Sequence, residues 1–265
     1  MNTKPIIATG RTAEIIEYDN EHVLKLFRPD LPEHLVEMEF NNSKAVYETG
    51  VHCPEPIEMR EYGGRKGILY TRISGSTMLQ TLFQNPSVLT EEARKFAAIH
   101  IDIHKRSVEK VPAQKERLEE QIKHAPLMTA QEKDQVAERL RKLRNGDQLC
   151  HGDFHPDNII HGESTDWVID WMTATRGNPA GDVARTYLML KFGQVAEEMP
   201  QDVQAMVAQV RNRILEIYLE EYLNQSSVTM DDIRDWTLPL AAARLGEWIP
   251  KEEKKQLLEW IRSHL

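Results

Sequence analysis

The order of the hydrophobic patterns most constrains the fold of this chain of 265 residues, because short strand-like segments come first and long helix-like segments follow. Two apolar segments, Ala13–Tyr18 and His22–Phe27, are separated by three polar residues, which is typical of a β-hairpin. A second hairpin is predicted for Ile57–Arg60 and Lys66–Arg72, which flank two glycines. Between the hairpins, Leu31–Glu48 carries apolar residues at helical spacing and is followed by a glycine, which predicts a helix.

Helical patterns dominate after Ser74-Gly75-Ser76. The predicted helices are Thr90–His104, Thr129–Leu143, Asp182–Phe192, Gln201–Tyr222, Met230–Leu245 and Lys251–His264. Short strands are predicted among them at Gln148–Cys150, Asn158–His161 and Trp167–Asp170. We therefore expect an α+β fold with a small β-rich N-terminal lobe, residues 1–74, and a larger α-helical C-terminal lobe, residues 75–265.

The composition argues against several classes of protein. The formal net charge is −9, and a chain this acidic neutralises few phosphates, so we expect no nucleic-acid partner. No segment reaches the roughly 18–20 consecutive apolar residues of a membrane span. No apolar stretch follows the N-terminus as in a signal peptide. Cys53 and Cys150 are too few for a disulfide framework, so we expect a cytoplasmic protein with no membrane partner.

Three polar residues between positions 151 and 170 indicate chemistry. Asn158 follows Asp153 after five positions, and Asp170 ends an apolar segment twelve positions later. Phosphoryl transfer needs a carboxylate that orients or deprotonates the attacking hydroxyl, and hard oxygen ligands for magnesium. One loop that carries an Asp and an Asn, with a second Asp after a strand, supplies these groups, and the spacing is that of a kinase catalytic loop and its metal-binding Asp.

In detail, these residues resemble the aminoglycoside phosphotransferase and choline kinase family. That family's catalytic loop reads His-Gly-Asp-x-x-x-x-Asn and its later motif reads Ile-Asp-Trp/Phe, which match His151–Asn158 and Ile169-Asp170-Trp171 here. The resemblance implies a bilobal protein kinase-like fold and transfer of the γ-phosphoryl group of ATP to a hydroxyl of a small molecule. The cofactors that it implies are ATP and Mg²⁺.

The resemblance also implies roles for single residues. Asp153 would be the catalytic base, and Asn158 and Asp170 would hold magnesium. Asp182 matches a family Asp that braces the catalytic loop, and His151 would likewise be structural.

Neighbouring residues have simpler interpretations. His155 is interpreted as packing in the loop rather than as a ligand, and Asp157 as a turn residue because it follows a proline. His100 and His104 lie four apart on a predicted helix and could mimic a metal pair, but no third ligand is evident. We interpret them as a helix face packed beneath the catalytic loop, and Trp171 as part of the core.

Lys25 stands inside the apolar segment Val23–Phe27, where it either points outward or needs a partner, because burying an ammonium alone is costly. The family places its phosphate-binding lysine in this strand, which favours the functional interpretation. The family's partner Glu lies about eleven residues before a Gly-Val pair, and Glu39 has that spacing from Gly50. We therefore predict Glu39, rather than Glu33 or Glu37, as the partner.

Two weaker matches complete the predicted nucleotide site. The segment Thr9–Glu14 has a single glycine, so backbone amides near Gly10 and the hydroxyl of Thr12 are the candidates for phosphate contacts. Thr71, Arg72 and Ile73 fall where the family's lobe hinge lies, and we predict adenine contacts there.

Departures from protein kinases favour a small-molecule acceptor. Gly152 stands where protein kinases have Arg, the Asp-Phe-Gly motif is replaced by Asp170-Trp171-Met172, and no Ala-Pro-Glu motif follows. A nucleotide-binding pseudokinase scaffold and a protein kinase remain alternatives. The acceptor is left open. Acidic residues on the late helices would suit an amine-bearing acceptor but are more simply a helix surface; they are Glu216, Glu220, Glu221, Asp231, Asp232 and Asp235.

Overall fold

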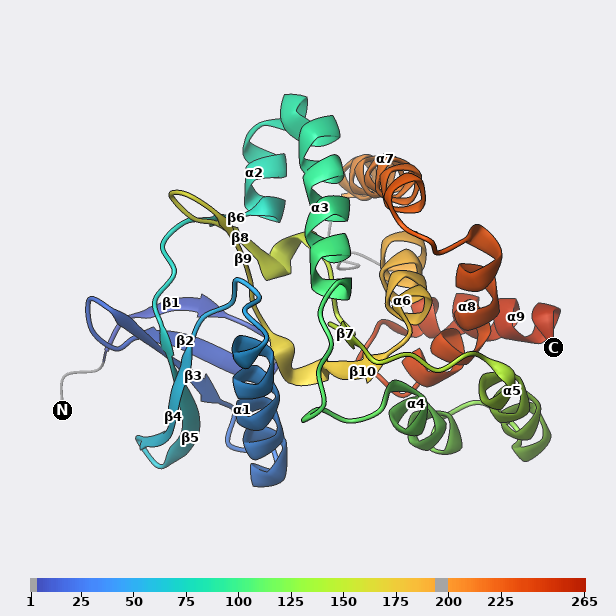
Figure 1. The fold of residues 1–265 in the computed structure, drawn as a ribbon, viewed down its shortest axis with the longest axis horizontal. Helices are drawn as coiled ribbons and strands as arrows, with labels where there is room; N and C mark the ends of the chain where they lie inside the picture. The colour runs from blue at the N-terminus through green and yellow to red at the C-terminus, as the bar shows by residue number, and fades with distance from the viewer. Residues whose placement is uncertain (1–3, 194–199) are drawn as a thin grey trace. The chain divides into compact units, whose positions relative to one another are not determined.

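The computed structural model describes residues 4–193 and 200–265 (Figure 1). The strands are β1 Ile6–Thr9, β2 Ala13–Glu17, β3 His22–Phe27, β4 Pro56–Tyr62, β5 Arg65–Thr71, β6 Ser76–Thr77, β7 Gln148–Cys150, β8 Ile159–His161, β9 Asp166–Val168 and β10 Thr175–Gly177. The α-helices are α1 Glu33–Glu48, α2 Met78–Gln84, α3 Leu89–His104, α4 Gln114–Lys123, α5 Ala130–Lys142, α6 Pro179–Phe192, α7 Gln201–Gln225, α8 Met230–Arg244 and α9 Lys251–His264. Short 3₁₀ helices are Pro86–Val88, Pro156–Asn158 and Trp171–Thr173.

The chain divides into two compact units. The first comprises the described residues of Met1–Thr81 with Val108–Val111 and Pro156–Ala174. The second comprises Leu82–Ser107, Pro112–His155 and the described residues of Thr175–Leu265.

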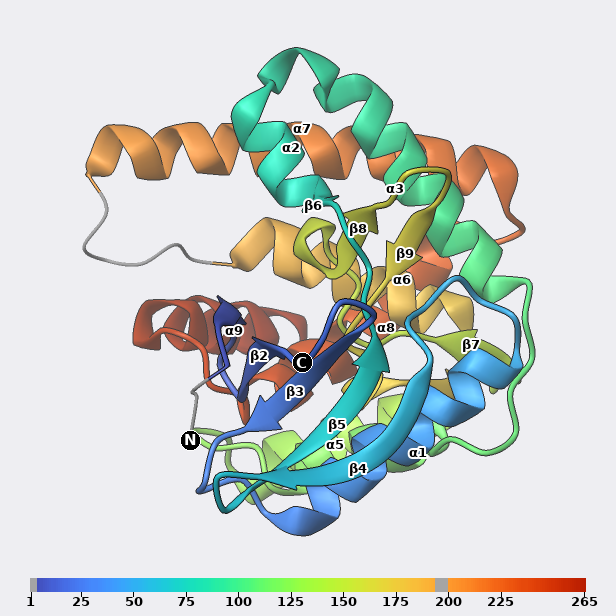
Figure 2. The ribbon, with the colours of Figure 1, turned by 90° about the vertical axis from the view of Figure 1, so that its left-hand side faces the viewer.

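An antiparallel sheet of five strands, in the order β1-β2-β3-β5-β4, forms most of the first unit, and α1 packs against it (Figure 2). Side chains alternate between the two faces of each strand. Leu24 and Leu26 therefore pack on one face, whereas Phe27 joins Val36 of α1 on the other. Lys25, two residues before Phe27, shares the face that α1 covers.

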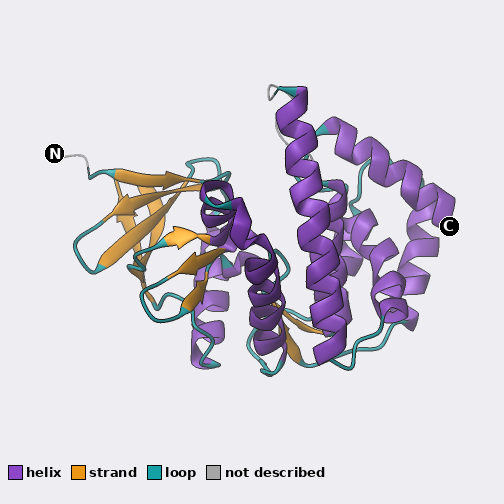
Figure 3. Cartoon of the chain, turned by 90° about the horizontal axis from the view of Figure 1, so that it is seen from above, coloured by secondary structure: helices purple, strands orange, loops and turns teal. Residues whose placement is uncertain are grey.

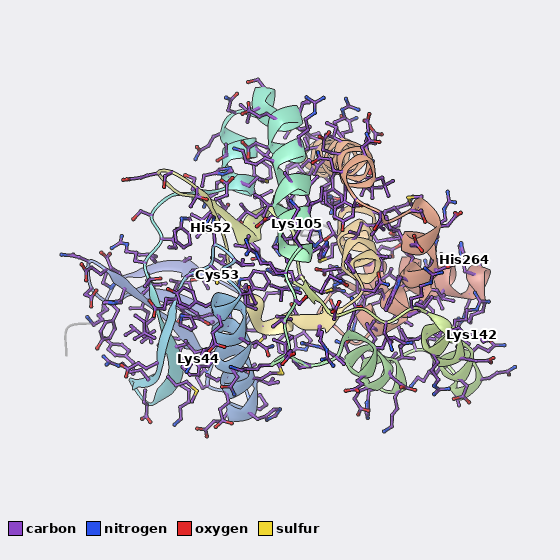
Figure 4. The ribbon with its side chains drawn as sticks, viewed as in Figure 1. Lys44, His52, Cys53, Lys105, Lys142 and His264 are labelled. Carbon is purple, nitrogen blue, oxygen red and sulfur yellow. The ribbon has the colours of Figure 1, made fainter. Side chains whose placement is uncertain are left out.

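A second sheet in this unit has the order β6-β8-β9. Ile159 of β8 pairs with Val168 of β9, and Thr77 of β6 pairs with Ile160. Figure 4 labels His52 and Cys53, which lie between α1 and β4 in the same unit. The backbone oxygen of His52 accepts the N–H of Val168 at 2.8 Å, which ties this segment to β9.

The second unit is almost entirely helical, apart from the strand pair β7 and β10 (Figure 3). Its core contains Phe96 of α3, Phe154 and Tyr218 of α7. The rings of Phe96 and Phe154 stack at 4.5 Å between centroids. Pro239 lies inside α8, where a missing N–H is expected to weaken the helix, and it is buried.

The predicted α+β class, with an N-terminal antiparallel sheet and a larger helical part, is confirmed. The predicted helices and hairpins are found with shifted ends. Five strands and α-helices were not predicted: the strands β1, β6 and β10, and the helices α2 and α4. The helix expected to start at Thr90 begins one residue earlier, after a 3₁₀ turn capped by Asn85. Of the helices described, none combines the length and the apolar character needed to cross a bilayer.

Candidate functional site

Lys25 lies beside two carboxylates of the first unit. Its Nζ is 2.6 Å from Oε1 of Glu39 and 3.0 Å from Oδ1 of Asp170. Glu39 is buried, and the Lys25 side chain is 11% exposed. Burial opposes the ionisation of the ammonium, but the charges of Asp170 and Glu39 outweigh it and raise the pKa of Lys25 above its ordinary value. Lys25 is therefore a fixed cation, which is the charge that nucleotide phosphates require.

The sequence of α1 explains the position of Glu39. Val36, Glu39 and Ser43 recur at spacings of three and four, so they lie on one buried face of the helix. The Tyr70 hydroxyl donates to Oε1 of Glu39 at 3.3 Å and is 3.0 Å from Oγ of Ser43. Sequence reasoning missed Tyr70, although its position two residues after Ile68, the residue paired with Lys25, places it on the same face of the sheet.

Asp170 adopts a left-handed backbone conformation with φ 65° and ψ 64°. A non-glycine residue is uncommon there, and such strain persists only where the flanking structure fixes it. Trp171 is buried and donates through Nε1 to the backbone oxygen of Val168 at 3.0 Å. Asn42 of α1 donates to the backbone oxygen of Met172 at 3.1 Å. The helix that presents Glu39 therefore also holds the segment that follows Asp170.

Asn158 and Asp170 lie at the same end of the β8 and β9 pair. Because Ile159 pairs with Val168, the preceding Asn158 lies opposite Ile169, whose N–H donates to the Asn158 backbone oxygen at 3.0 Å. Asn158 is buried, whereas the Asp170 side chain is 41% exposed. A carboxylate and a side-chain amide oxygen are hard donors of the kind that magnesium prefers, so this donor set fits that ion.

The loop with Gly10 and Thr12 closes the hairpin of β1 and β2. The N–H of Gly10 donates to the oxygen of Ala13 at 2.8 Å, so this amide is engaged within the turn. The oxygen of Thr12 accepts the N–H of Arg28 at 2.9 Å. The amide of Gly10 itself is thus engaged within the turn, and phosphate contacts by the amides near Gly10 and by the hydroxyl of Thr12 stay predictions.

Thr71, Arg72 and Ile73 follow β5. The N–H of Thr71 donates to the backbone oxygen of Glu55 at 3.1 Å, and the N–H of Arg72 donates to the backbone oxygen of Glu21 at 2.7 Å. Both amides are used by the sheet, so among these three residues an amide donor for adenine is left to Ile73. Adenine contact at these residues stays a prediction.

Asp153 lies in the second unit, in the loop that follows β7. Its Oδ2 is 3.5 Å from Nε2 of His155, and its Oδ1 is 3.7 Å from Nη2 of Arg185. Burial opposes ionisation of this carboxyl, but the hydrogen bond and charge of His155, with the charges of Arg185 and His151, lower its pKa well below the ordinary range. Asp153 is therefore a carboxylate that can accept a hydrogen bond from a hydroxyl.

Asp182 of α6 connects the loop to α3. Its Oδ1 accepts the N–H of Gly152 at 2.8 Å, and its Oδ2 accepts the N–H of His151 at 2.6 Å. Oδ2 also lies 3.0 Å from Nε2 of His100 and 3.2 Å from Nε2 of His104. Asp182 is therefore the third polar group beside the two histidines, and the sequence alone did not reveal that it lies there.

The histidine pair is satisfied within the protein. Nδ1 of His100 is 2.7 Å from the hydroxyl of Tyr218, and Nδ1 of His104 is 2.7 Å from that of Tyr222. Burial lowers the pKa of His100 to about 3, so it is neutral. His100 also stacks on Phe154 at 4.0 Å between ring centroids. This geometry agrees with the packing interpretation rather than with metal ligation.

The predicted site residues thus fall into two groups. Lys25, Glu39, Asn158 and Asp170 belong to the first unit, and the structure joins Lys25, Glu39 and Asp170 by direct contacts. Asp153, His151 and Asp182 belong to the second unit, where Asp182 holds the backbone beside Asp153.

The acidic residues of the late helices are largely engaged at the surface. Glu216 pairs with Arg213 at 3.0 Å, Asp231 pairs with Arg234 at 2.8 Å, and Asp232 caps α8 through Thr229. These pairs favour the helix-surface interpretation.

Figure 4 labels Lys142 and His264, which lie at the ends of α5 and α9. Arg139 of α5 joins the two helices, because it donates to the backbone oxygen of His264 at 2.7 Å.

Comparison with known proteins adds independent findings. The family model described as the phosphotransferase enzyme family, APH, matches residues 8–208. No curated protein matches the chain by sequence.

Solved structures share the fold at low identity. A thermostable mutant of aminoglycoside phosphotransferase APH(4)-Ia, in a ternary complex with ADP and hygromycin B, is 12% identical with a TM-score of 0.65; the match covers 99% of this chain and 91% of that chain. An aminoglycoside-3'-phosphotransferase of type VIII is 14% identical with a TM-score of 0.61 and coverage of 91% and 93%. APH(2")-IIa in a ternary complex with streptomycin and ATP is 13% identical with a TM-score of 0.58 and coverage of 99% and 91%. The expectation of a kinase-like fold is confirmed by these likenesses.

Proposed function

Because this chain belongs to the phosphotransferase enzyme family and is thereby a small-molecule kinase, we propose that it transfers the γ-phosphoryl group of ATP to a hydroxyl of its acceptor with the aid of Mg²⁺. The observation that carries the proposal is the contact of Lys25 with both Glu39 and Asp170. A cation held between a structural carboxylate and a predicted metal ligand is the arrangement that positions nucleotide phosphates. The complexes of the similar structures with ADP and ATP support a nucleotide substrate.

Each residue has a proposed role. Lys25 binds the nucleotide phosphates, and Glu39 fixes Lys25. Asn158 and Asp170 would hold magnesium, which neutralises phosphate charge. Asp153 accepts a hydrogen bond from the acceptor hydroxyl and orients it.

The reaction balances without another reactant. The acceptor oxygen bonds to the γ-phosphorus while the bond from that phosphorus to the bridging oxygen of ADP breaks. The hydroxyl proton leaves through Asp153, which passes it on to solvent or product.

We propose a small-molecule acceptor that carries a hydroxyl, such as an aminoglycoside, an amino sugar, a choline-like alcohol or another metabolite. The similar structures hold hygromycin B and streptomycin, which supports testing aminoglycosides first. Turnover is measured as ADP release from Mg²⁺-ATP with a panel of such acceptors, and mass spectrometry identifies the phosphorylated product. Asp153→Asn is the paired variant, because it keeps the side-chain shape and removes the charge.

Loss of about 10²–10⁴ in kcat in Asp153→Asn, with nucleotide binding retained, is the expected result. Full activity in that variant on an identified acceptor would remove Asp153 from the mechanism. Binding of Mg²⁺-ATP without turnover on any acceptor would instead favour a pseudokinase scaffold, and phosphate transfer to protein alone would favour a protein kinase.

A further inference from the structure

One face of α6 holds the main chain around Asp153. Asp182, Arg185 and Thr186 lie three and four positions apart, so they share that face. Asp182 accepts the N–H of Gly152 at 2.8 Å, and Nε of Arg185 donates to the oxygen of Gly152 at 3.1 Å. Oγ1 of Thr186 donates to the oxygen of Phe154 at 2.9 Å. Because Gly152 is held at both its N–H and its oxygen, Asp153 begins from a fixed peptide.

Arg185 differs from the other two side chains because it also brings a charge to Asp153. Its Nη2 lies 3.7 Å from Oδ1 of Asp153, which is too long for a hydrogen bond and close enough for a strong charge interaction. His155 faces the other oxygen, with Nε2 at 3.5 Å from Oδ2. Each oxygen of the carboxylate therefore has a different basic group beside it.

The guanidinium of Arg185 is itself fixed by a carboxylate. Nη1 is 2.7 Å from Oε1 of Glu247, and Nη2 donates to Oε2 of Glu247 at 2.8 Å, which is the paired geometry that fixes the plane of an arginine. Glu247 also binds Arg244 at 2.9 Å, and Arg244 binds the buried Glu253. Arg185 is buried as well, so the guanidinium has little freedom to turn away from Asp153.

On the basis of the proposed function, we propose that Arg185 is a positioning residue for Asp153: it fixes the loop peptide through Gly152, and its charge beside Oδ1 holds the Asp153 carboxylate in the orientation that the acceptor hydroxyl requires. The geometry assigns Glu247 to hold Arg185 in this position. Arg185 needs no contact with either substrate for this role.

The electrostatics of Asp153 agree with this assignment. Burial alone would raise the pKa of this carboxyl, and the groups that lower it are His155, Arg185 and His151. The paired Glu247 offsets part of the Arg185 charge at longer range. Removal of Arg185 therefore leaves a buried carboxylate with only histidines beside it, and its pKa rises.

The test compares Arg185→Gln with Arg185→Lys. Gln removes the charge, whereas Lys keeps the charge and loses the fork that joins Gly152 to Glu247. We expect kcat of the Gln variant to fall about 100-fold, the size of loss that follows misplacement of a reacting group, while KM for ATP stays within about threefold. We expect Lys to restore part of that loss. Arg234→Gln is the matched control, because Arg234 is an exposed arginine whose ion pair, within the part of the chain that the structure describes, is with the exposed Asp231.

A second measurement does not depend on activity. Carbon NMR of protein labelled in aspartate carboxyls follows the titration of Asp153, with Asp153→Asn identifying its signal. We expect the Asp153 pKa to rise by about one unit or more in Arg185→Gln, the size of shift that an adjacent arginine causes, and to change little in Arg185→Lys.

These readouts separate the proposal from the proposed function. If the wild type transfers phosphate to no hydroxyl but the Asp153 titration still shifts, the proposed function fails and the coupling of Arg185 to Asp153 stands. An unchanged Asp153 titration in Arg185→Gln, or a kcat in that variant equal to that of the wild type, overturns the proposal. If Arg185→Gln does not fold, Glu247→Gln replaces it: a wild-type kcat in both Glu247→Gln and Arg185→Lys also overturns the proposal.

Discussion

Replacement of Asp182 by Asn tests whether one buried carboxylate organises the loop that carries Asp153. Oδ1 accepts one N–H, from Gly152, and Oδ2 faces three nitrogen donors, from His151, His100 and His104. An Asn can place its oxygen at only one of these positions. The better placement puts the amide oxygen at the Oδ2 position, where it keeps the three donors. The NH₂ group then takes the place of Oδ1, which accepts the N–H of Gly152 at 2.8 Å in the wild type, so two donors face each other.

The magnitude follows from this count. A buried donor without a partner costs about 1–3 kcal/mol, and the loss of charge assistance in the other three bonds adds to it. We expect the free energy of unfolding to fall by about 3–5 kcal/mol. For a protein of this size, about 2–4 °C of melting temperature corresponds to each kcal/mol, so the midpoint should fall by about 10 °C.

The measurement is thermal unfolding at pH 7. Burial opposes ionisation of Asp182, but the hydrogen bonds from His100 and His104 lower its pKa well below the ordinary value. The stabilisation is therefore present above the unfolded pKa of about 4 and is lost as the pH falls through the lower folded pKa, so pH 7 shows it in full. Asp231→Asn, at an exposed helix position, is the control and should shift the midpoint by no more than about 2 °C. A shift equally small in Asp182→Asn would refute the reasoning.

Three further predictions concern the sites in the two units. Glu39→Gln keeps an oxygen for the hydrogen bonds from Lys25 and Tyr70 but removes the charge, so kcat/KM for ATP should fall about ten- to hundredfold in steady-state assays. An unchanged kcat/KM would argue against the role of Lys25 in phosphate binding. Gly152→Ala places a side chain on a residue whose φ is 78°, a backbone conformation that strains any residue with a Cβ. The free energy of unfolding from urea titration should therefore fall by about 1–2 kcal/mol, and an unchanged urea midpoint would contradict this strain. Because the pKa of Asp153 is lowered, its charge should persist from pH 7 down to about pH 5; a loss of kcat near pH 6 that disappears in Asp153→Asn would contradict this.

The first unit was largely predictable because its signals are local. Alternation along Val23–Phe27 separates the face of Leu24 from that of Lys25. The resemblance to the family adds a spacing of about eleven residues before Gly50, which selects Glu39. The structure places Glu39 beside Lys25 and leaves Glu37 exposed. Edge strand β1 has an entirely exposed pattern, so it lacks the alternation by which a strand is recognised in sequence.

The surroundings of Asp153 were less predictable because they depend on contacts between distant segments. His100 and His104 at a spacing of four suggest a common face, but nothing in the sequence indicates that Asp182 lies beside both, 78 positions beyond His104. Arg185 is in contact with Glu247, which lies 62 positions later in the chain and shortly after α8, so this contact depends on how α6 and α8 pack.

Because α6 anchors the loop, the chain should tolerate single-residue insertions in this helix less well than insertions elsewhere. Asp182, Arg185 and Thr186 each form a hydrogen bond with a main-chain atom of the loop, so the position of the loop depends on the rotation of α6 about its axis. One residue inserted between Asp182 and Arg185 would turn the later positions by about 100° and advance them by about 1.5 Å. Arg185 and Thr186 would then leave the helix face that Asp182 occupies, so the three anchors could not reach their targets together. We therefore expect a library of single-residue insertions to be depleted in α6 between these anchors, yet to be tolerated at the exposed turn of Gly63 and Gly64, where space is open.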